Sequence, residues 1–173
     1  MYLRGIGNTV ITGSADQPQW VLTGTDIKCI GNIENLLDYA TVKSGKHSNM
    51  SSYCYSYMFD RCINLTKAPD LPAETLTEYC YFYMFNSCTS LTKAPELPAI
   101  TLASHCYKGM FQECTSLTKA PALPAITLAS HCYEGMFNGC TSLTQAPALP
   151  ATVLAMYCYS DMFYRCSSLT KIP

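Results

Sequence analysis

The stretch LPAITLASHCYKGMFQECTSLTKAPA, residues 97–122, returns with few changes at residues 123–148 and in more divergent form on both sides. Two sets of five cysteines repeat at intervals of 26 residues, namely Cys54, Cys80, Cys106, Cys132 and Cys158, and Cys62, Cys88, Cys114, Cys140 and Cys166. A fixed period of about 20 to 50 residues is typical of a stacked array, in which each unit buries its apolar face against its neighbours. The sequence therefore predicts a repeat protein.

The period divides the chain into a cap and an array. We expect an N-terminal cap at 1–44, made of short strands and a helix at 32–44, followed by five 26-residue repeats at 45–173, the last of them incomplete. Asn32 is a suitable N-cap for this helix, and Gly45 is typical of a helix end. The cap and its helix together resemble one degenerate coil.

Three short β-type runs precede the helix, TVIT at 9–12, QWVLTG at 19–24 and DIKCI at 26–30. Glycine, asparagine, aspartate and proline separate them, as expected for strands joined by turns. They predict a β cap that covers the open end of the first coil. Trp20, the single tryptophan, is expected to pack beneath this cap.

Each repeat is expected to contain one short helical segment and one short strand. Cys106, Tyr107, Met110, Phe111 and Cys114 follow the spacing i, i+1, i+4, i+5 and i+8, which indicates a broad apolar stripe on a helix. The motif SLTKAP after it fits a short strand, limited by prolines that cannot donate to a ladder. Because strands stack about 4.8 Å apart and helices about 8 to 10 Å apart, the array should curve with its sheet inside.

The units CTSLTKAPxLPAxTLAxxCYxxMFxxC resemble the BspA-like class of leucine-rich repeats, found in large surface proteins of anaerobic host-associated bacteria and some mucosal protozoa. The opening YLRGIGNTVITG and the segment GNIENLLDYATV are similar to the lead-in of such arrays. The resemblance implies an α/β repeat fold, a curved right-handed leucine-rich-repeat solenoid with one short parallel strand and one short helical segment per coil. It also implies adhesion to host or bacterial partners. This chain departs from the family by carrying alanine where a larger aliphatic residue is common in the strand.

Composition excludes some classes of function. Charged residues make up 13% of the 173 residues and the net charge is -1, whereas an average protein has about 25% charged residues. No cluster of lysine and arginine suits a nucleic acid, and no apolar run is long enough to span a bilayer. The start MYLRGIGNTV lacks the apolar core of a signal peptide. We expect a piece of a longer parent protein that is displayed at the cell surface or secreted.

The eleven cysteines invite a disulfide or metal interpretation. Cysteines eight residues apart on a helix would lie roughly 12 Å apart, beyond the Cα separation of about 7 Å that a disulfide tolerates. We therefore expect reduced cysteines that pack as small hydrophobes. Disulfides between coils and a metal site remain alternatives.

His105-Cys106 and His131-Cys132 suggest a thiolate nucleophile beside a base. However, neighbours on a helix or turn diverge by about 100°. Tyrosine also occupies the histidine slot in the other repeats, at Tyr53, Tyr79 and Tyr157. The sequence therefore predicts a rim of aromatic side chains, no enzyme, and neither a cofactor nor a metal site.

Several repeated columns could form either core or contact surface. Phenylalanine and methionine columns predict core ladders, whereas the tyrosine column from Tyr55 to Tyr159 fits either the edge of the core or an exposed contact strip. A threonine–lysine column is expected on the sheet face, as a solvated ladder or as a concave binding strip. The candidate binding residues are Thr92, Lys93, Thr118, Lys119, Thr144 and Gln145.

These features favour a noncatalytic protein-binding or adhesion module whose partner is a protein or glycan on a host or bacterial surface. The alternative is a structural spacer or assembly element of a fibre, phage tail or cell envelope. The last coil stops at Lys171-Ile172-Pro173 without a polar cap. We expect either further repeats or self-association at that edge.

Overall fold

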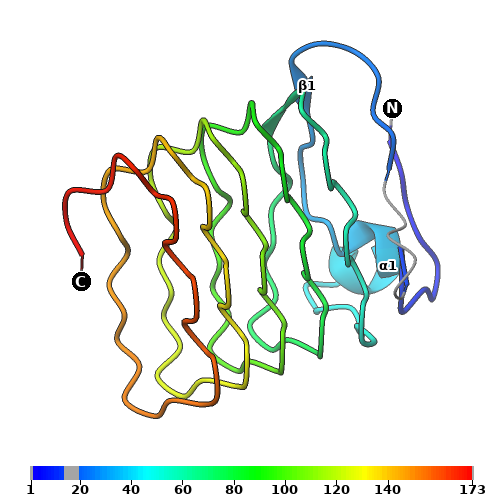
Figure 1. The fold of residues 1–173 in the computed structure, drawn as a ribbon. Coiled ribbons are helices and arrows are strands. Elements are labelled where there is room, and N and C mark those ends of the chain that lie inside the picture. Colours follow the sequence, from blue (N-terminus) through cyan, green and yellow to red (C-terminus); the bar gives the residue numbers. More distant parts are fainter. Residues whose placement is uncertain (1, 14–19, 173) are drawn as a thin grey trace.

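The computed structural model, which describes residues 2–13 and 20–172, shows a chain wound into coils that stack along one axis (Figure 1). Helix α1 (Asn35–Lys43) lies at the N-terminal end of the stack. Strand β1 (Ile27–Lys28) pairs in parallel with strand β2 (Leu65–Lys67). The described residues therefore contain one helix and one short two-stranded parallel sheet, and most of each coil is formed by turns and irregular backbone.

Parallel pairing on the strand side is sparser than the sequence predicts. At the positions equivalent to β2, the later described coils carry one isolated parallel bridge, Gln145↔Lys171, instead of strands. Two further isolated bridges, Thr75↔Thr101 and Thr127↔Val153, lie in the segments that follow the prolines. The prediction of one strand in every coil is wrong to this extent. Prolines follow each of these segments and limit how far a ladder can extend, because a proline nitrogen has no hydrogen to donate; β2 carries the same prolines, at Pro69 and Pro72, and ends before them.

The opposite wall contains no helix among the described residues, which corrects the prediction of a helical segment in every coil. Consecutive turns form it instead; we call it the turn wall, and it comprises residues 53–62, 79–88, 105–114, 131–140 and 157–166. In the first segment the even-numbered amides from Ser56 to Cys62 donate to the carbonyl three residues earlier. The odd-numbered amides from Tyr53 to Arg61 donate to the next coil, as Tyr55 N–H does to Cys80 O at 2.9 Å.

Backbone conformation explains why the turn wall is not a helix. Every fourth residue has a positive φ, with 60° at Tyr53, 56° at Tyr57 and 57° at Arg61. A right-handed helix needs a negative φ throughout, so each left-handed residue closes one turn and starts the next. The apolar spacing has the same period of four, because Cys54, Met58 and Cys62 are all buried.

The turn wall also removes the physical reason for the predicted curvature. Coils in this wall are joined by backbone hydrogen bonds, and the rings of Phe59 and Phe85 stack with their centroids 5.4 Å apart. Packed helices would need about 8 to 10 Å. The turn wall therefore lacks the wide helix spacing on which the predicted curvature depends.

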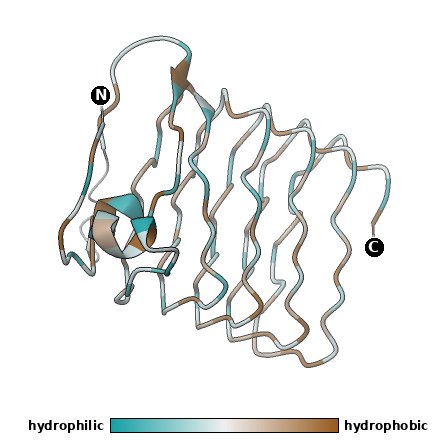
Figure 2. Ribbon diagram, turned by 180° about the vertical axis from the view of Figure 1, so that it is seen from behind, coloured by the Kyte–Doolittle hydropathy of each residue, from teal (hydrophilic) through white to brown (hydrophobic). Residues whose placement is uncertain are grey.

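The core lies between the two walls and continues through the stack. Leu65, Leu91, Leu117 and Leu143 point into it from the strand side, and each is fully buried. Cysteine, tyrosine, methionine and phenylalanine columns fill it from the turn wall. Figure 2 shows hydrophobic residues recurring in every coil. The phenylalanine and methionine columns are thus core ladders, as the sequence predicts.

The N-terminal segment covers the first coil through backbone hydrogen bonds. Gly5 N–H donates to Asn35 O at 2.7 Å, and Ile11 N–H donates to Cys54 O at 2.9 Å. A Cβ on Gly5 would overlap the carbonyl of Leu36, so the close approach requires glycine. Of the three predicted strands only DIKCI contains one, β1. The first residue of QWVLTG lies outside the described residues. The described part contributes Trp20, whose ring packs edge-on against the ring of Phe59, with the centroids 6.0 Å apart.

Helix α1 lies within the predicted range 32–44 but begins three residues later. The Asn32 side chain accepts the N–H of Glu34 at 2.8 Å, so it holds the turn before the helix. Asp38 interrupts the helix with extended dihedral angles, φ -148° and ψ 99°. Gly45, with a φ of 80°, follows the last turn, as is typical of a helix end.

Candidate functional site

The six candidate residues of the sheet face all lie exposed on the strand side. We call them the Thr–Lys strip: Thr92, Lys93, Thr118, Lys119, Thr144 and Gln145. In the third repeat, Leu117 precedes the exposed pair and Ala120 follows it, and both are buried. Buried residues on both sides therefore hold each exposed pair in place, and equivalent pairs from successive coils form one repeated surface.

Threonine and the long side chains of the strip play different roles. The amide and the hydroxyl of Thr144 both donate to Thr118 O at 3.5 Å, and those of Thr170 both donate to Thr144 O at 3.2 Å. These threonines therefore tie one coil to the preceding one. Lys93, Lys119 and Gln145 make no side-chain hydrogen bond within the described chain, so their polar ends are available to a partner.

A groove of about 660 Å³ runs beside the three long side chains. Lys93, Lys119 and Gln145 line it, with Glu96 as its single carboxylate. The rest of the lining consists of alanine and leucine and of the prolines Pro121, Pro124, Pro147 and Pro150. Since proline restricts the backbone, this groove has firm walls.

The charges in this region are unpaired. In the described part of the chain, the ion pairs formed by lysine are Lys28–Asp26 at 2.8 Å and Lys108–Glu134 at 3.0 Å. Lys93 and Lys119 lie outside these pairs. Their ammonium groups can therefore bind an acceptor without first breaking an internal salt bridge.

The tyrosine column belongs to the core, which settles the alternative that the sequence leaves open. Tyr55, Tyr81, Tyr107 and Tyr133 are buried, and successive ring centroids lie between 5.6 Å and 5.9 Å apart. Burial holds the pKa of Tyr81 well above its usual range. These rings stabilise the stack and do not form a contact strip.

The histidine slot forms a stacked ladder at the rim of the turn wall. The ring centroids of Tyr79 and His105 are 4.4 Å apart, and those of His105 and His131 are 4.5 Å apart. Tyr53 stacks on Tyr79 at 4.5 Å and Tyr157 tilts against His131. The slot is thus a rim of aromatic rings, as the sequence predicts.

A charged cluster lies beside this ladder and was not predicted from the sequence. Glu134 Oε2 accepts from Lys108 Nζ at 3.0 Å and from His131 Nδ1 at 2.6 Å. Burial opposes ionisation of Glu134, but the hydrogen bonds from His131 and Lys108 outweigh it and hold the pKa of the carboxyl below its usual range. Lys108 and Glu134 occupy equivalent positions 26 residues apart, which is the signal that could have revealed the pair.

The His–Cys neighbours are poorly placed for nucleophilic catalysis. The Cys106 and Cys132 side chains are fully buried, and burial raises the pKa of the Cys132 thiol to about 12. His105 instead stacks between two rings of the rim ladder. A buried thiol with a raised pKa supplies almost no thiolate near neutral pH.

The second cysteine column has a structural role. Cys114 Sγ donates to Phe85 O at 3.1 Å, in the preceding coil. Cys88, Cys140 and Cys166 repeat this bond to the equivalent phenylalanine carbonyls. All eleven cysteines are free thiols in the structure. The thiol thus acts as a small buried group that also donates a weak hydrogen bond.

Residues 2–13 and 20–172 hold no group of three or more histidine, cysteine, aspartate or glutamate side chains arranged to bind a metal ion. Within the same residues, no helix combines the length and the apolar character needed to cross a membrane. No protein family, no curated protein and no solved structure matches this chain. The arguments for function therefore come from the surface itself.

Proposed function

We propose that this chain is a noncatalytic protein-binding or adhesion module, built as a right-handed leucine-rich-repeat solenoid of the BspA-like kind within a surface-exposed protein. The Thr–Lys strip and its groove are the contact surface. The partner is a protein or a glycan on a host or bacterial surface. The observation that supports this most is the groove of about 660 Å³ beside two lysines that have no ion-pair partner among the described residues.

Repetition makes such a surface suited to extended partners. Equivalent side chains recur once per coil, so a partner that spans several coils meets the same group each time. Each exposed lysine contributes only about 0.2 to 1 kcal/mol to a contact. Affinity would then depend on the number of coils that the partner covers rather than on a single pocket.

The test is binding of the fluorescently labelled chain to intact epithelial cells and to a panel of intact bacteria, measured by flow cytometry. Replacing Lys93 and Lys119 together by alanine should weaken binding about two- to tenfold, given the modest energy of each exposed charge. The matched control replaces Lys43 and Lys46, two exposed lysines near the end of α1. Equal binding by the two double variants would refute the strip as the contact surface.

A spacer or assembly element is the second candidate, and a separate observation favours it. Each coil of the turn wall donates to the next through the same alternate amides, as Tyr81 N–H does to Cys106 O and Tyr107 N–H does to Cys132 O, both at 3.0 Å. Such a stack can be lengthened or shortened by whole coils. A fibre, phage tail or cell envelope could use this to set a distance between its parts.

A further inference from the structure

A second cavity, of about 700 Å³, lies at the N-terminal end of the stack, remote from the Thr–Lys strip. It opens between the N-terminal segment, the stretch around β1 and the first repeat. Met58 and Phe59, both buried, form part of its lining together with Trp20 and Leu22. Its size falls within the range of about 300 to 1,000 Å³ that is typical of small-molecule sites.

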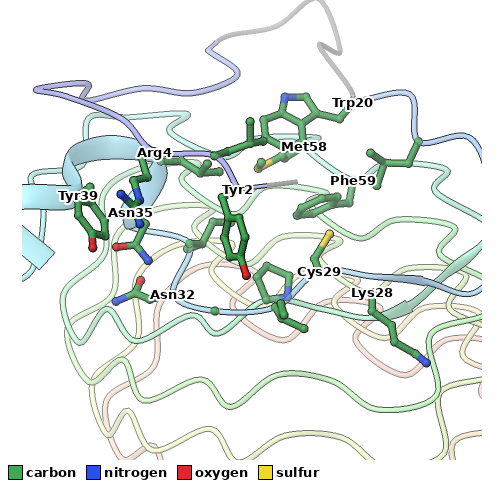
Figure 3. A pocket seen from close by; sticks show the side chains of 17 residues that line it. Tyr2, Arg4, Trp20, Lys28, Cys29, Asn32, Asn35, Tyr39, Met58 and Phe59 are labelled. Carbon is green, nitrogen blue, oxygen red and sulfur yellow. The ribbon is translucent and has the colours of Figure 1, made fainter. Parts of the chain in front are cut away.

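The cavity has an apolar side and a polar side (Figure 3). Trp20, Met58 and Phe59 lie together on one side, and Arg4, Asn32 and Asn35 lie together on the other. Apolar residues at the mouth are left in solvent, since Tyr2 is 93% exposed and Ile30 is 74% exposed. A ligand with an apolar body would cover these residues and fill the space behind them.

The charge of the lining has a single sign. Among the described residues, Arg4 and Lys28 are the charged side chains that line the cavity, and no carboxylate does. Lys28 already binds Asp26 at 2.8 Å. Arg4 has no carboxylate within ion-pair distance among the described residues, and its guanidinium lies over the ring of Tyr39 at 4.1 Å from the centroid. The cavity therefore presents one oriented, uncompensated cation next to two side-chain amides.

We infer that this cavity binds an aliphatic monocarboxylate, the chemical class of medium-chain fatty acids. The tail would pack against the partly exposed Trp20, Leu22 and Cys29, with Met58 and Phe59 buried behind them, and the carboxylate would pair with Arg4. A guanidinium and a carboxylate match in geometry and can form two parallel hydrogen bonds. Stacking on Tyr39 holds the guanidinium in place, which lowers the entropy lost when it binds.

Trp20, as the single tryptophan, reports directly on this site. Titration of the full chain with octanoate, decanoate and dodecanoate, each below its micelle-forming concentration, should change the tryptophan emission in a saturable way. Each added CH₂ that enters the cavity should tighten binding about fourfold. No change in emission with any of the three acids would overturn the inference, and so would affinities that do not depend on tail length.

Three variants and a neutral ligand test separately whether Arg4 binds the carboxylate and whether the apolar part of the cavity binds the tail. Arg4→Gln should weaken binding of decanoate at least about tenfold, as expected for a charged hydrogen bond, while leaving the affinity for decanol unchanged. Arg61→Gln, at an exposed arginine of the turn wall, is the matched control and should leave both affinities unchanged. Cys29→Phe, which fills the cavity, should abolish binding of both ligands. Equal losses of decanoate and decanol binding in Arg4→Gln would refute the pairing with Arg4.

Discussion

Left-handed residues at every fourth position of the turn wall carry much of the strain in this fold. Tyrosine, histidine, serine, glutamate, aspartate and arginine all occupy such positions, for example Tyr79, with a φ of 56°, and His105, with a φ of 59°. This conformation costs an ordinary residue about 1 to 2 kcal/mol. A stacked aromatic pair contributes about 0.5 to 1.5 kcal/mol, and a hydrogen bond to the next coil contributes about as much. The neighbouring coils therefore offset the strain.

Gly109 tests this balance at a single residue. Its φ is 61°, and a Cβ there would overlap the ring of Tyr83 from the preceding coil. We expect Gly109→Ala to lower the free energy of unfolding by about 2 to 4 kcal/mol, because backbone strain adds to displacement of the ring. Urea denaturation followed by circular dichroism measures this change.

Gly7 provides the control for the Gly109 substitution. Its φ is 60°, yet a Cβ there would meet nothing within 4 Å. Gly7→Ala should therefore cost only the conformational part, about 1 kcal/mol. Equal losses of stability in the two variants would mean that the contact with Tyr83 contributes nothing.

At the scale of the element, the turn wall brings titratable groups together that are far apart in the sequence. His105 lies between the rings of Tyr79 and His131, and its Nδ1 is buried without a hydrogen-bond partner among the described residues. Burial, followed by the charges of His131 and Lys108, lowers the pKa of His105 below its usual 6.5, although Glu134 and Glu78 act in the opposite direction. The folded wall therefore resists protonation of this ring.

This pKa shift predicts a loss of stability in mild acid. The unfolded chain takes up a proton at His105 from about pH 6.5 downward, before the folded chain does, so stability falls as the pH drops toward the lowered folded pKa. Glu134 adds a similar loss only below its usual value of 4.5. We expect the urea midpoint to be lower at pH 5.5 than at pH 7.5.

The repeats themselves supply the variant that isolates this effect. His105→Tyr introduces the residue that fills the same slot at Tyr79 and Tyr157, so stacking is kept and the titrating group is removed. The difference between the urea midpoints at pH 7.5 and pH 5.5 should be smaller in this variant. An unchanged difference would show that His105 does not cause the pH dependence.

Sequence patterns predicted the elements unevenly, and the turn wall shows why. Cys106, Met110 and Cys114 stand four apart, as do Tyr107 and Phe111, and over so few turns a period of four resembles the helical period of 3.6. The glycines at left-handed positions, Gly109, Gly135 and Gly139, were the signal against a helix. Local propensity could not decide between a helix and a series of turns, because the turns are stabilised by hydrogen bonds between coils and these bonds exist only in the stack.

At the scale of the molecule, the stack is a translation of one coil along the axis. In the turn wall, the odd-numbered amides of one coil donate hydrogen bonds to carbonyls of the following coil, and equivalent amides do so in successive coils. Phe85 and Phe111 stack at 5.6 Å, and Phe111 and Phe137 stack at 5.8 Å. Any inner coil could therefore be replaced by its neighbour without loss of pairing.

This translation predicts that the chain tolerates deletion of residues 97–122. After the deletion Tyr81 would meet the carbonyl of Cys132, and Phe85 would stack on Phe137, since these are equivalent positions. We expect a cooperatively unfolding protein with a smaller urea m-value, shorter by about 5 Å in X-ray scattering.

Deletion of residues 97–109 alone is the control, because half a coil shifts every column out of register and should prevent folding. If the whole-coil deletion also failed to fold, the interchangeability of coils would be wrong.

The whole-coil deletion also separates the two proposed functions. A spacer would keep its activity at a shorter reach, whereas an adhesion module would bind cells more weakly because Lys119 and part of its groove are gone.

The sequence by itself determined the period, the positions of the units, the core columns of methionine and phenylalanine, and the exposure of the Thr–Lys strip. These follow from the 26-residue repeat, since equivalent residues of stacked coils must meet. Tertiary structure alone decided the conformation of the turn wall, the burial of the tyrosine column, the Lys108–Glu134–His131 cluster and the cavity beside Trp20. Each of these depends on contacts between coils or with the N-terminal segment, and such contacts form only when residues distant in the sequence are brought together.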